Sequence, residues 1–205
     1  MKIKPAIVGE ICTNCYVVFD EASSEGLVID PGAEFEKIER LLKKYSVKVK
    51  YVILTHGHYD HIAAAGEVKK FTGAPILVQA EDAAMLSDPA GNGSIFFTGS
   101  EVRLKSDRSL SDGEFLEFGA CKLQVLHTPG HSYGGICLAG ENVIFTGDTL
   151  FRAGIGRTDI PNTSYSQIME SIRKKLMIYP DDTIIYPGHG YISTIGEERK
   201  NLSKY

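Results

Sequence analysis

The 205-residue sequence has few cysteines, no long hydrophobic run and no excess of positive charge. Four cysteines in a chain of this size do not make a disulfide-stapled scaffold. The formal net charge is −4, and the 22 basic residues are scattered apart from the run Arg173-Lys174-Lys175. A nucleic-acid partner is therefore not expected, because polyanion binding needs a concentrated basic surface.

The N-terminal segment is charged but is not followed by the apolar stretch of a signal peptide. No apolar run approaches the roughly 20 residues that a membrane-spanning helix needs. With 43% hydrophobic residues and no linker-like stretch, the chain can bury one full core. We expect a soluble, cytoplasmic protein that forms a single domain over residues 1–205 and has no membrane partner. Its oligomeric state is not predicted.

Cys12 and Cys15 have the C-x-x-C spacing of a redox pair or of half a zinc site. No second pair of this kind occurs in the sequence. We therefore favour a structural role, with Cys15 packed in a strand over residues 15–19.

Short β-rich runs alternate with turn-rich segments along the chain. They predict strands over residues 3–8, 16–19, 27–29, 51–54, 76–78, 115–118, 122–126, 135–138, 143–145 and 183–186. Apolar residues at helical spacing predict helices over residues 34–45, 62–71 and 165–176, with shorter turns over 81–86 and from 194 onward. Strands followed by helices occur twice, which predicts two sheets with helices outside them.

Periodicity is lost over residues 87–110, where several glycines interrupt the chain. Loops of this length are often functional. Two interpretations of Phe96 and Phe97 stay open: they line a substrate cleft, or they pack in the core like most paired aromatics.

Three histidines and an aspartate follow the strand predicted over residues 51–54. His56 and His58 flank Gly57, which permits a tight bend, so both rings can reach one ion. Asp60 and His61 begin the next helix and leave the strand end in another direction, which suits a second ion nearby. The cluster predicts a metal site.

Further polar residues follow other predicted strands. His131, Asp148 and His189 each come after a strand end and a glycine, where a rigid sheet edge can hold ligands that are distant in sequence. Asp30 also ends a strand, and it is either an acceptor behind a ligand imidazole or an ordinary turn residue.

Together these motifs resemble the metallo-β-lactamase-fold superfamily, over most of the chain. The likeness rests on Thr-His-Gly-His-Tyr-Asp-His at 55–61, His-Thr-Pro-Gly-His at 127–131, Gly-Asp-Thr-Leu-Phe at 147–151 and Pro-Gly-His at 187–189. Within the superfamily the sequence is most similar to glyoxalase II (hydroxyacylglutathione hydrolase) and its short relatives, through residues 154–159 and the closing Pro-Gly-His-Gly. The resemblance implies an α+β fold, a four-layer αββα sandwich.

The resemblance also implies the metal ligands: His56, His58 and His131 on one ion, Asp60, His61 and His189 on a second, and Asp148 bridging them. His127 is left as a strand-end or supporting residue. Nitrogen and oxygen donors suit two divalent ions, best Zn²⁺, with iron or manganese as alternatives. Two such ions lower the pKa of a shared water enough to supply hydroxide, which Asp60 would orient.

The implied activity is hydrolysis of a small thioester such as an S-acylglutathione. Thiolate leaves readily, and no Ser-His or Cys-His arrangement suggests a covalent intermediate. Arg157 and Tyr191 match family positions near the thiol half of the substrate. The alternatives are that Arg157 is a solvated loop charge and that Tyr191 is a packing residue. Asp159 stands where the family has a tyrosine, and the family's C-terminal helical segment, which helps to hold glutathione, has no counterpart here.

Other functions remain open at this point. A persulfide dioxygenase with mononuclear iron shares Gly-Arg-Thr-Asp at 156–159. Lactone or phosphodiester hydrolysis is chemically possible at the same ions, and a non-catalytic metalloprotein is the third class.

Overall fold

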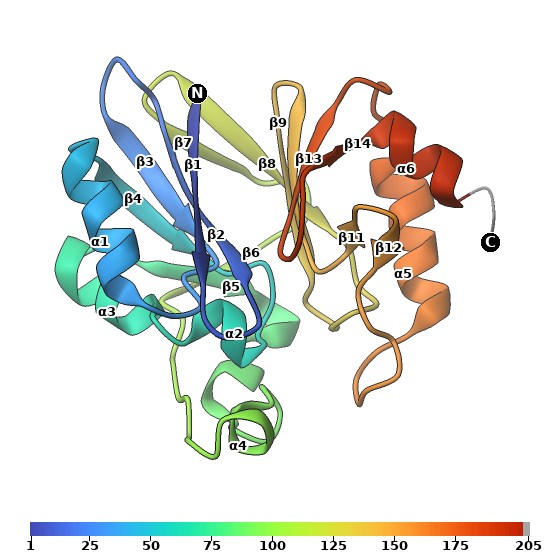
Figure 1. The fold of residues 1–205 in the computed structure, drawn as a ribbon, viewed down its shortest axis with the longest axis horizontal. Helices are drawn as coiled ribbons and strands as arrows, with labels where there is room; N and C mark the ends of the chain where they lie inside the picture. Colours follow the sequence, from blue (N-terminus) through green and yellow to red (C-terminus); the bar gives the residue numbers. More distant parts are fainter. Residues whose placement is uncertain (203–205) are drawn as a thin grey trace.

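The computed structural model describes residues 1–202, which form two six-stranded sheets face to face (Figure 1). The first sheet pairs antiparallel over its first three strands and parallel over the rest. In spatial order it contains β1 (Lys2–Val8), β2 (Thr13–Phe19), β3 (Glu25–Ile29), β4 (Lys48–Ile53), β5 (Ile76–Gln79) and β6 (Arg108–Leu110).

The second sheet is antiparallel except where β10 and β13 run parallel. Its spatial order is β14 (Ser193–Thr194), β13 (Ile184–Pro187), β10 (Val143–Gly147), β9 (Ile136–Gly140), β8 (Cys121–His127) and β7 (Phe115–Phe118). A small hairpin of β11 (Leu150–Phe151) and β12 (Gly154–Ile155) follows β10.

Helices cover the outer faces of both sheets (Figure 1). On the first sheet lie α1 (Phe35–Lys44) and α3 (Ala65–Thr72), and on the second lie α5 (Tyr165–Ser171), its continuation η3 (Ile172–Leu176), and α6 (Ile195–Leu202). The short α2 (Tyr59–Ile62), η1 (Ala80–Asp82), η2 (Met85–Ser87) and α4 (Ser94–Phe97) lie in connections. The predicted αββα sandwich is confirmed.

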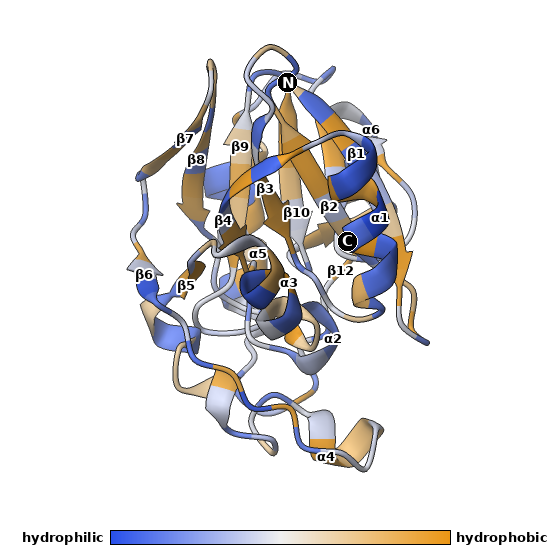
Figure 2. Ribbon diagram, turned by 90° about the vertical axis from the view of Figure 1, so that its left-hand side faces the viewer, coloured by the Kyte–Doolittle hydropathy of each residue, from blue (hydrophilic) through white to orange (hydrophobic). Residues whose placement is uncertain are grey.

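Alternating side chains produce three buried layers. In β2, Cys15 and Val17 face α1 and α3, whereas Tyr16 and Val18 face the second sheet. A third cluster, which includes Ile168, packs α5 against the second sheet. Figure 2 shows hydrophobic residues concentrated in the strands. Each fully buried aliphatic side chain contributes about 1.5–3 kcal/mol, so these layers dominate the stability of the fold.

Some predicted elements are wrong in detail. The helix predicted over 62–71 is two helices, α2 and α3, separated at Ala63 and Ala64. The region 87–110 is not wholly irregular, because it contains α4 and β6. The strand at 183–186 is not the last one, because β14 follows it. None of the helices in residues 1–202 is long and apolar enough to cross a bilayer.

Other predictions are resolved by burial. Cys15 is buried in β2, as the structural interpretation predicted, and Cys12 is exposed. Phe96 and Phe97 are 74% and 66% exposed, so their assignment to the core is wrong. The reason is local, because α4 belongs to a loop that projects away from both sheets (Figure 1).

Candidate metal centre

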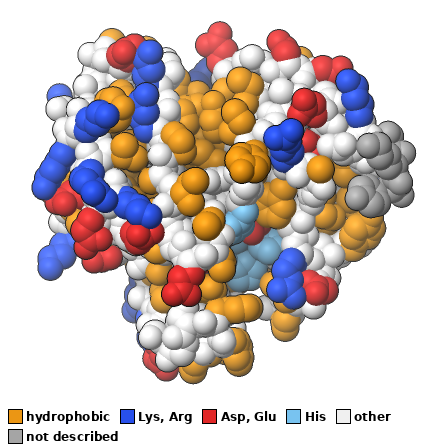
Figure 3. All heavy atoms as spheres, viewed as in Figure 1, with side chains coloured by type: hydrophobic (Ala, Val, Ile, Leu, Met, Phe, Trp, Pro, Cys, Tyr) orange, Lys and Arg blue, Asp and Glu red, His pale blue; other side chains and the backbone are white. Residues whose placement is uncertain are grey.

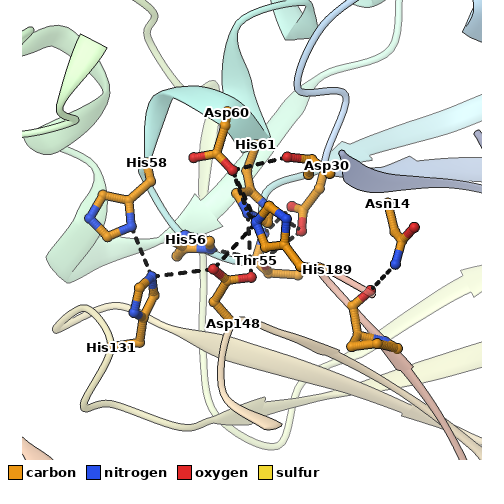
Figure 4. Close-up of polar contacts among 12 residues, drawn as sticks. Asn14, Asp30, Thr55, His56, His58, Asp60, His61, His131, Asp148 and His189 are labelled. Atoms are coloured by element: carbon orange, nitrogen blue, oxygen red, sulfur yellow. Dashed lines mark hydrogen bonds and ion pairs between the residues drawn. The ribbon is translucent and has the colours of Figure 1, made fainter. Parts of the chain in front are cut away.

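The seven residues predicted as ligands come together at one end of the sandwich. His56 and His58 follow β4, and Asp60 and His61 lie on α2. His131 lies between β8 and β9, Asp148 follows β10 and His189 follows β13. Because β10 and β13 run parallel, their carboxyl ends place the last two residues side by side. Figure 4 shows side chains from both halves of the chain pointing into one cluster.

The donor atoms form three overlapping groups, in each of which they lie within 4.8 Å of one another. The groups are His56, His58 and His131; His56, His61 and Asp148; and Asp60, His61 and His189. In the first, His58 Nδ1 lies 3.0 Å from His131 Nε2. In the last, Asp60 Oδ2 lies 3.1 Å from His61 Nε2 and 3.2 Å from His189 Nε2.

Asp148 lies between the two outer groups. Its Oδ1 is 3.4 Å from His61 Nε2, and its Oδ2 is 3.5 Å from His131 Nε2 and 3.6 Å from His189 Nε2. Nitrogen ligands at about 2.0–2.1 Å around a tetrahedral zinc lie roughly 3.3–3.4 Å apart. The spacing of the donors is therefore the spacing that ligands around such ions adopt.

Hydrogen bonds from outside fix which nitrogen of each ring points inward. His61 Nδ1 lies 2.9 Å from Asp30 Oδ2, His131 Nδ1 lies 3.0 Å from the Arg157 carbonyl oxygen, and His189 Nδ1 lies 3.2 Å from the Ile11 carbonyl oxygen. These oxygens can only accept, so each outer nitrogen carries a proton and each Nε2 faces the cluster, where its lone pair is available when the ring is neutral.

His56 is oriented by Thr55 and Asp30. The Thr55 hydroxyl donates its proton to Asp30 Oδ2 at 2.7 Å. Because that proton is used, Thr55 Oγ1 can only accept from His56 Nδ1, which lies 3.1 Å away. Asp30 thus supports both His56 and His61, and its predicted place behind an imidazole of the cluster is confirmed. Thr55 itself was not predicted.

The donor set fits metal ions. His56 Nε2 and Asp148 Oδ1 are buried and have no hydrogen-bond partner within the described chain. Buried unpaired polar atoms are costly, so their presence indicates a partner of another kind. Five imidazoles and two carboxylates suit zinc, iron or manganese.

The pKa values of the imidazoles differ between the first donor group, which holds His56 and His58, and the group that holds His61. Burial and the nearby His131 lower the pKa of His58 to about 3, and burial also holds the pKa of His56 well below its usual range. Burial opposes the charge of His61 as well, but Asp60, Asp148 and Asp30 outweigh it and raise the pKa of that imidazole. The His56 and His58 rings are therefore neutral bases at neutral pH, as metal binding requires.

Two residues of β2 support the cluster, Thr13 through Asp60 on α2 and Asn14 through the loop after β13, and neither was predicted from the sequence. Thr13 Oγ1 donates to Asp60 Oδ2 at 3.0 Å. The Asn14 amide donates to the Pro187 and Gly190 carbonyl oxygens at 3.0 and 2.9 Å and so holds the loop that carries His189. Thr13 and Asn14 lie between Cys12 and Cys15, in a strand that is buried at every position. Polar side chains in such a strand were the signal from which a supporting role could have been predicted.

Asp82 joins the two ligand loops of the first group. Its carboxylate accepts from the Gly57 amide at 2.9 Å and from the Gly134 amide at 2.6 Å. Gly57 does not have the left-handed backbone expected of a tight bend, and a Cβ there would instead press on Met85 at 3.2 Å. No pattern in the sequence pointed to Asp82.

The predicted substrate residues lie on loops beside the cluster. Tyr191 is 78% exposed, so packing is not its role. Arg157 is exposed and forms an ion pair with Asp159. His127 lies at the end of β8, where its Nε2 is 2.8 Å from the Tyr133 carbonyl oxygen, and it belongs to none of the three donor groups.

An αββα sandwich with histidine and aspartate donors at one end of its sheets is the architecture of a metal-dependent hydrolase. The chain belongs to the metallo-beta-lactamase superfamily, whose family model matches residues 9–189. Among curated relatives, hydroxyacylglutathione hydrolase GloC from Haemophilus influenzae is 35% identical over 192 residues, which cover 92% of this chain and 90% of that protein.

Solved structures agree with this assignment. The B3 metallo-beta-lactamase BLEG-1 superposes with a TM-score of 0.92 at 34% identity and covers 97% of each chain. TTHA1623, solved in a di-iron-bound form, has a TM-score of 0.85 at 29% identity and covers 97% of this chain and 98% of its own. ETHE1 from Myxococcus xanthus has a TM-score of 0.78 at 30% identity, and the match covers 98% of this chain and 83% of that one.

Proposed function

We propose that the protein is a hydrolase of small thioesters, such as S-acylglutathiones, that works with two divalent metal ions. The convergence of seven nitrogen and oxygen donors at the ends of both sheets is the observation that carries this proposal. In this assignment His56, His58 and His131 would hold one ion, and Asp60, His61 and His189 would hold the second, with Asp148 in reach of both groups.

The chain's own residues would position the reacting groups. Two bound ions supply Lewis acidity and lower the pKa of a water toward neutral. Asp60 is the proposed catalytic residue, because Thr13 anchors its Oδ2 while its other oxygen points toward the His58 side of the cluster (Figure 4). That free oxygen can accept a hydrogen bond from the attacking water and orient it. A thioester expels thiolate, so no protonated group is needed for departure.

The similarity to GloC supports a thioester, and Arg157 and Tyr191 are proposed to contact its thiol half. We take zinc as the metal, and the di-iron form of TTHA1623 keeps iron as the alternative. The four cysteines are all free, which suits the proposed cytoplasmic location, where thiols stay reduced.

Steady-state hydrolysis of a panel of thioesters by zinc-loaded protein tests this function. His58→Ala should reduce kcat/KM on the order of 100-fold or more, because it removes a proposed ligand. His127→Ala is the matched control, since it removes a histidine outside the donor groups and should change kcat/KM only a few-fold. Wild-type rates no higher than those of His58→Ala on every thioester would refute the proposal.

The second candidate is a persulfide dioxygenase with mononuclear iron. The similarity to ETHE1 from Myxococcus xanthus keeps this candidate open, and the di-iron form of TTHA1623 favours iron as the metal. Metal analysis of protein purified without added metal separates the two candidates. Two zinc ions per chain support the hydrolase, whereas one iron with oxygen consumption on glutathione persulfide supports the dioxygenase. Lactones and phosphodiesters in the same panel test the remaining hydrolytic alternatives.

A further inference from the structure

Asp82 is a buried carboxylate that binds two loops of the metal centre. It lies at the end of η1, and 2% of its surface is exposed. Its Oδ2 accepts from the Gly57 amide at 2.9 Å, and its Oδ1 accepts from the Gly134 amide at 2.6 Å. Both carboxylate oxygens are therefore in use, each on a different loop.

The two amides lie beside proposed ligands that come from different sheets. Gly57 immediately precedes His58 and follows β4 of the first sheet, whereas Gly134 lies three residues after His131 and precedes β9 of the second. His58 Nδ1 and His131 Nε2 are 3.0 Å apart (Figure 4). Asp82 thus connects the two backbone segments that set the distance between these rings.

Packing presses both loops onto the same connection. A Cβ added to Gly134 would lie 2.5 Å from the Asp82 amide nitrogen and 2.8 Å from Asp82 Cβ. A Cβ added to Gly57 would lie 3.2 Å from the side chain of Met85. Asp82 and Met85 belong to η1 and η2, which follow β5, so one short segment supports both loops.

A backbone hydrogen bond joins the same loops nearer to their strands. The Ile136 amide donates to the Thr55 carbonyl oxygen at 2.9 Å. Gly57 lies two residues beyond Thr55 and Gly134 two residues before Ile136, so Asp82 joins the loops further out. The outer parts of these loops reach the surface, where Figure 3 shows histidines in a hollow between the two halves of the molecule. Their support therefore comes from the buried side, where Asp82 lies.

We propose that Asp82 is a positioning residue that fixes the spacing of the first donor group and thereby sets the affinity of this group for its ion. The inference rests on the metal centre of the proposed function, but not on its thioester chemistry. A carboxylate is required because the two amides approach different oxygens, so an asparagine would turn a donor toward one of them. Both bonds of Asp82 go to loops of the first group, so the group that holds His61 should not depend on it.

Zinc titration of metal-free protein against a chromophoric chelator tests this role. Asp82→Asn should bind one ion about 10- to 100-fold more weakly than wild type, the usual effect of losing a residue that supports metal ligands, and the other ion equally well. In His58→Ala, where the first group is already broken, adding Asp82→Asn should change zinc affinity no further. In His189→Ala it should still weaken the remaining ion.

Asp20→Asn is the matched control. Asp20 is 8% exposed, and its two oxygens accept from the Ala22 and Ala120 amides at 3.3 Å each, so it also joins two distant loops. It follows β2 at the end opposite to Thr13, which contacts the cluster. Asp20→Asn should therefore keep both zinc affinities at the wild-type values.

Amide hydrogen exchange in the metal-free protein, followed by nuclear magnetic resonance, tests the support without zinc or catalysis. The Gly57 and Gly134 amides should exchange about tenfold faster in Asp82→Asn than in wild type, because they lose a charged acceptor. In Asp20→Asn the two amides should exchange at the wild-type rate.

The role of Asp82 would be overturned by wild-type zinc affinities in Asp82→Asn, by an equal loss in Asp20→Asn, or by unchanged amide exchange. If Asp82→Asn does not fold, Gly134→Ala replaces it, since the added Cβ would push the same loop off Asp82. Gly134→Ala should weaken one ion selectively, and two wild-type affinities there would also overturn the role. The proposed function fails separately, if zinc binds in the Asp82-dependent way but no thioester is hydrolysed. A wild-type protein that binds no zinc would refute both.

Discussion

At the residue scale, Asp30 has a strained backbone, and its carboxylate makes several hydrogen bonds that depend on this conformation. Its φ is +50°, in the left-handed region that residues other than glycine avoid. There it accepts from the Thr55 amide at 2.7 Å, from the Thr55 hydroxyl and from His61. Aspartate and asparagine tolerate this backbone better than most residues, so exchanging them tests the carboxylate and not the turn.

Asp30→Asn should lower zinc affinity about 10- to 100-fold, the usual effect of losing an acceptor behind a ligand imidazole. The amide would present a donor to His61 Nδ1, which is itself a donor. Competition with a chromophoric chelator measures the affinity. Exposed Asp182→Asn is the control with the same change of charge, and equal affinities in the two variants would contradict this role.

Position 188 has room only for glycine, because the side chains of the cluster lie directly against it. A Cβ there would overlap Asp148 Oδ1 and lie 2.8 Å from His61 Cε1. Gly188→Ala should therefore bind fewer than two zinc ions per chain, as measured by mass spectrometry under native conditions. Gly154→Ala provides the matched control, since a Cβ at Gly154 has nothing within 4 Å. Full zinc occupancy in Gly188→Ala would show that the cluster is less tightly packed than the structure indicates.

At the scale of elements, β2 holds the loop that carries His189. The Asn14 amide and the Tyr16 hydroxyl both donate to the Pro187 carbonyl oxygen, and the Asn14 backbone amide donates to the Gly188 carbonyl oxygen. These bonds join the first sheet to the end of β13 and thus bring together ligands from the two halves of the chain.

Asn14→Ala should lower the free energy of unfolding by about 1–3 kcal/mol, because the Pro187 and Gly190 carbonyl oxygens each lose one donor. Urea denaturation monitored by circular dichroism measures the change. Asn201→Ala on α6, which removes a contact with Glu198 at 3.1 Å far from the centre, should cost less. A loss of unfolding free energy for Asn14→Ala that is no larger than for Asn201→Ala would contradict the role of Asn14 in holding the His189 loop.

The strands that the sequence predicts are those with their own hydrophobic pattern. For β7 the predicted bounds match those of the structure, and the longer strands agree within a few residues. The missed strands β6, β11, β12 and β14 have two or three residues each, and they exist only because a neighbouring strand offers hydrogen bonds. The break at Ala63 and Ala64 was missed because alanine favours helix and gives no stop signal.

At the scale of the whole molecule, the seven cluster residues could be named from the sequence because each lies in a short motif that resembles a motif of the superfamily. Apart from Asp30, their supporting partners could not be named. Asp82 and Asn14 act on backbone groups distant in sequence, 173 positions away for the Asn14 bond to Pro187. Such contacts depend on how the two sheets face each other, and no local pattern encodes that.

Because the proposed ligands come from both sheets, bound ions should stabilise the whole fold. An ion that binds only the native state adds about 4 kcal/mol at a concentration 1,000 times its Kd. Chelation should therefore lower Tm in circular dichroism melts, and added zinc should restore it until two ions are bound. A Tm that does not depend on zinc would mean that the ions do not bind across the two sheets.

The most direct test is anomalous diffraction from crystals grown with zinc. Two peaks should appear, one bound by His56, His58 and His131 and the other by Asp60, His61 and His189, each at about 2.0–2.2 Å from its ligand atoms, with Asp148 in reach of both. A single peak, or peaks away from these side chains, would contradict the two-metal centre.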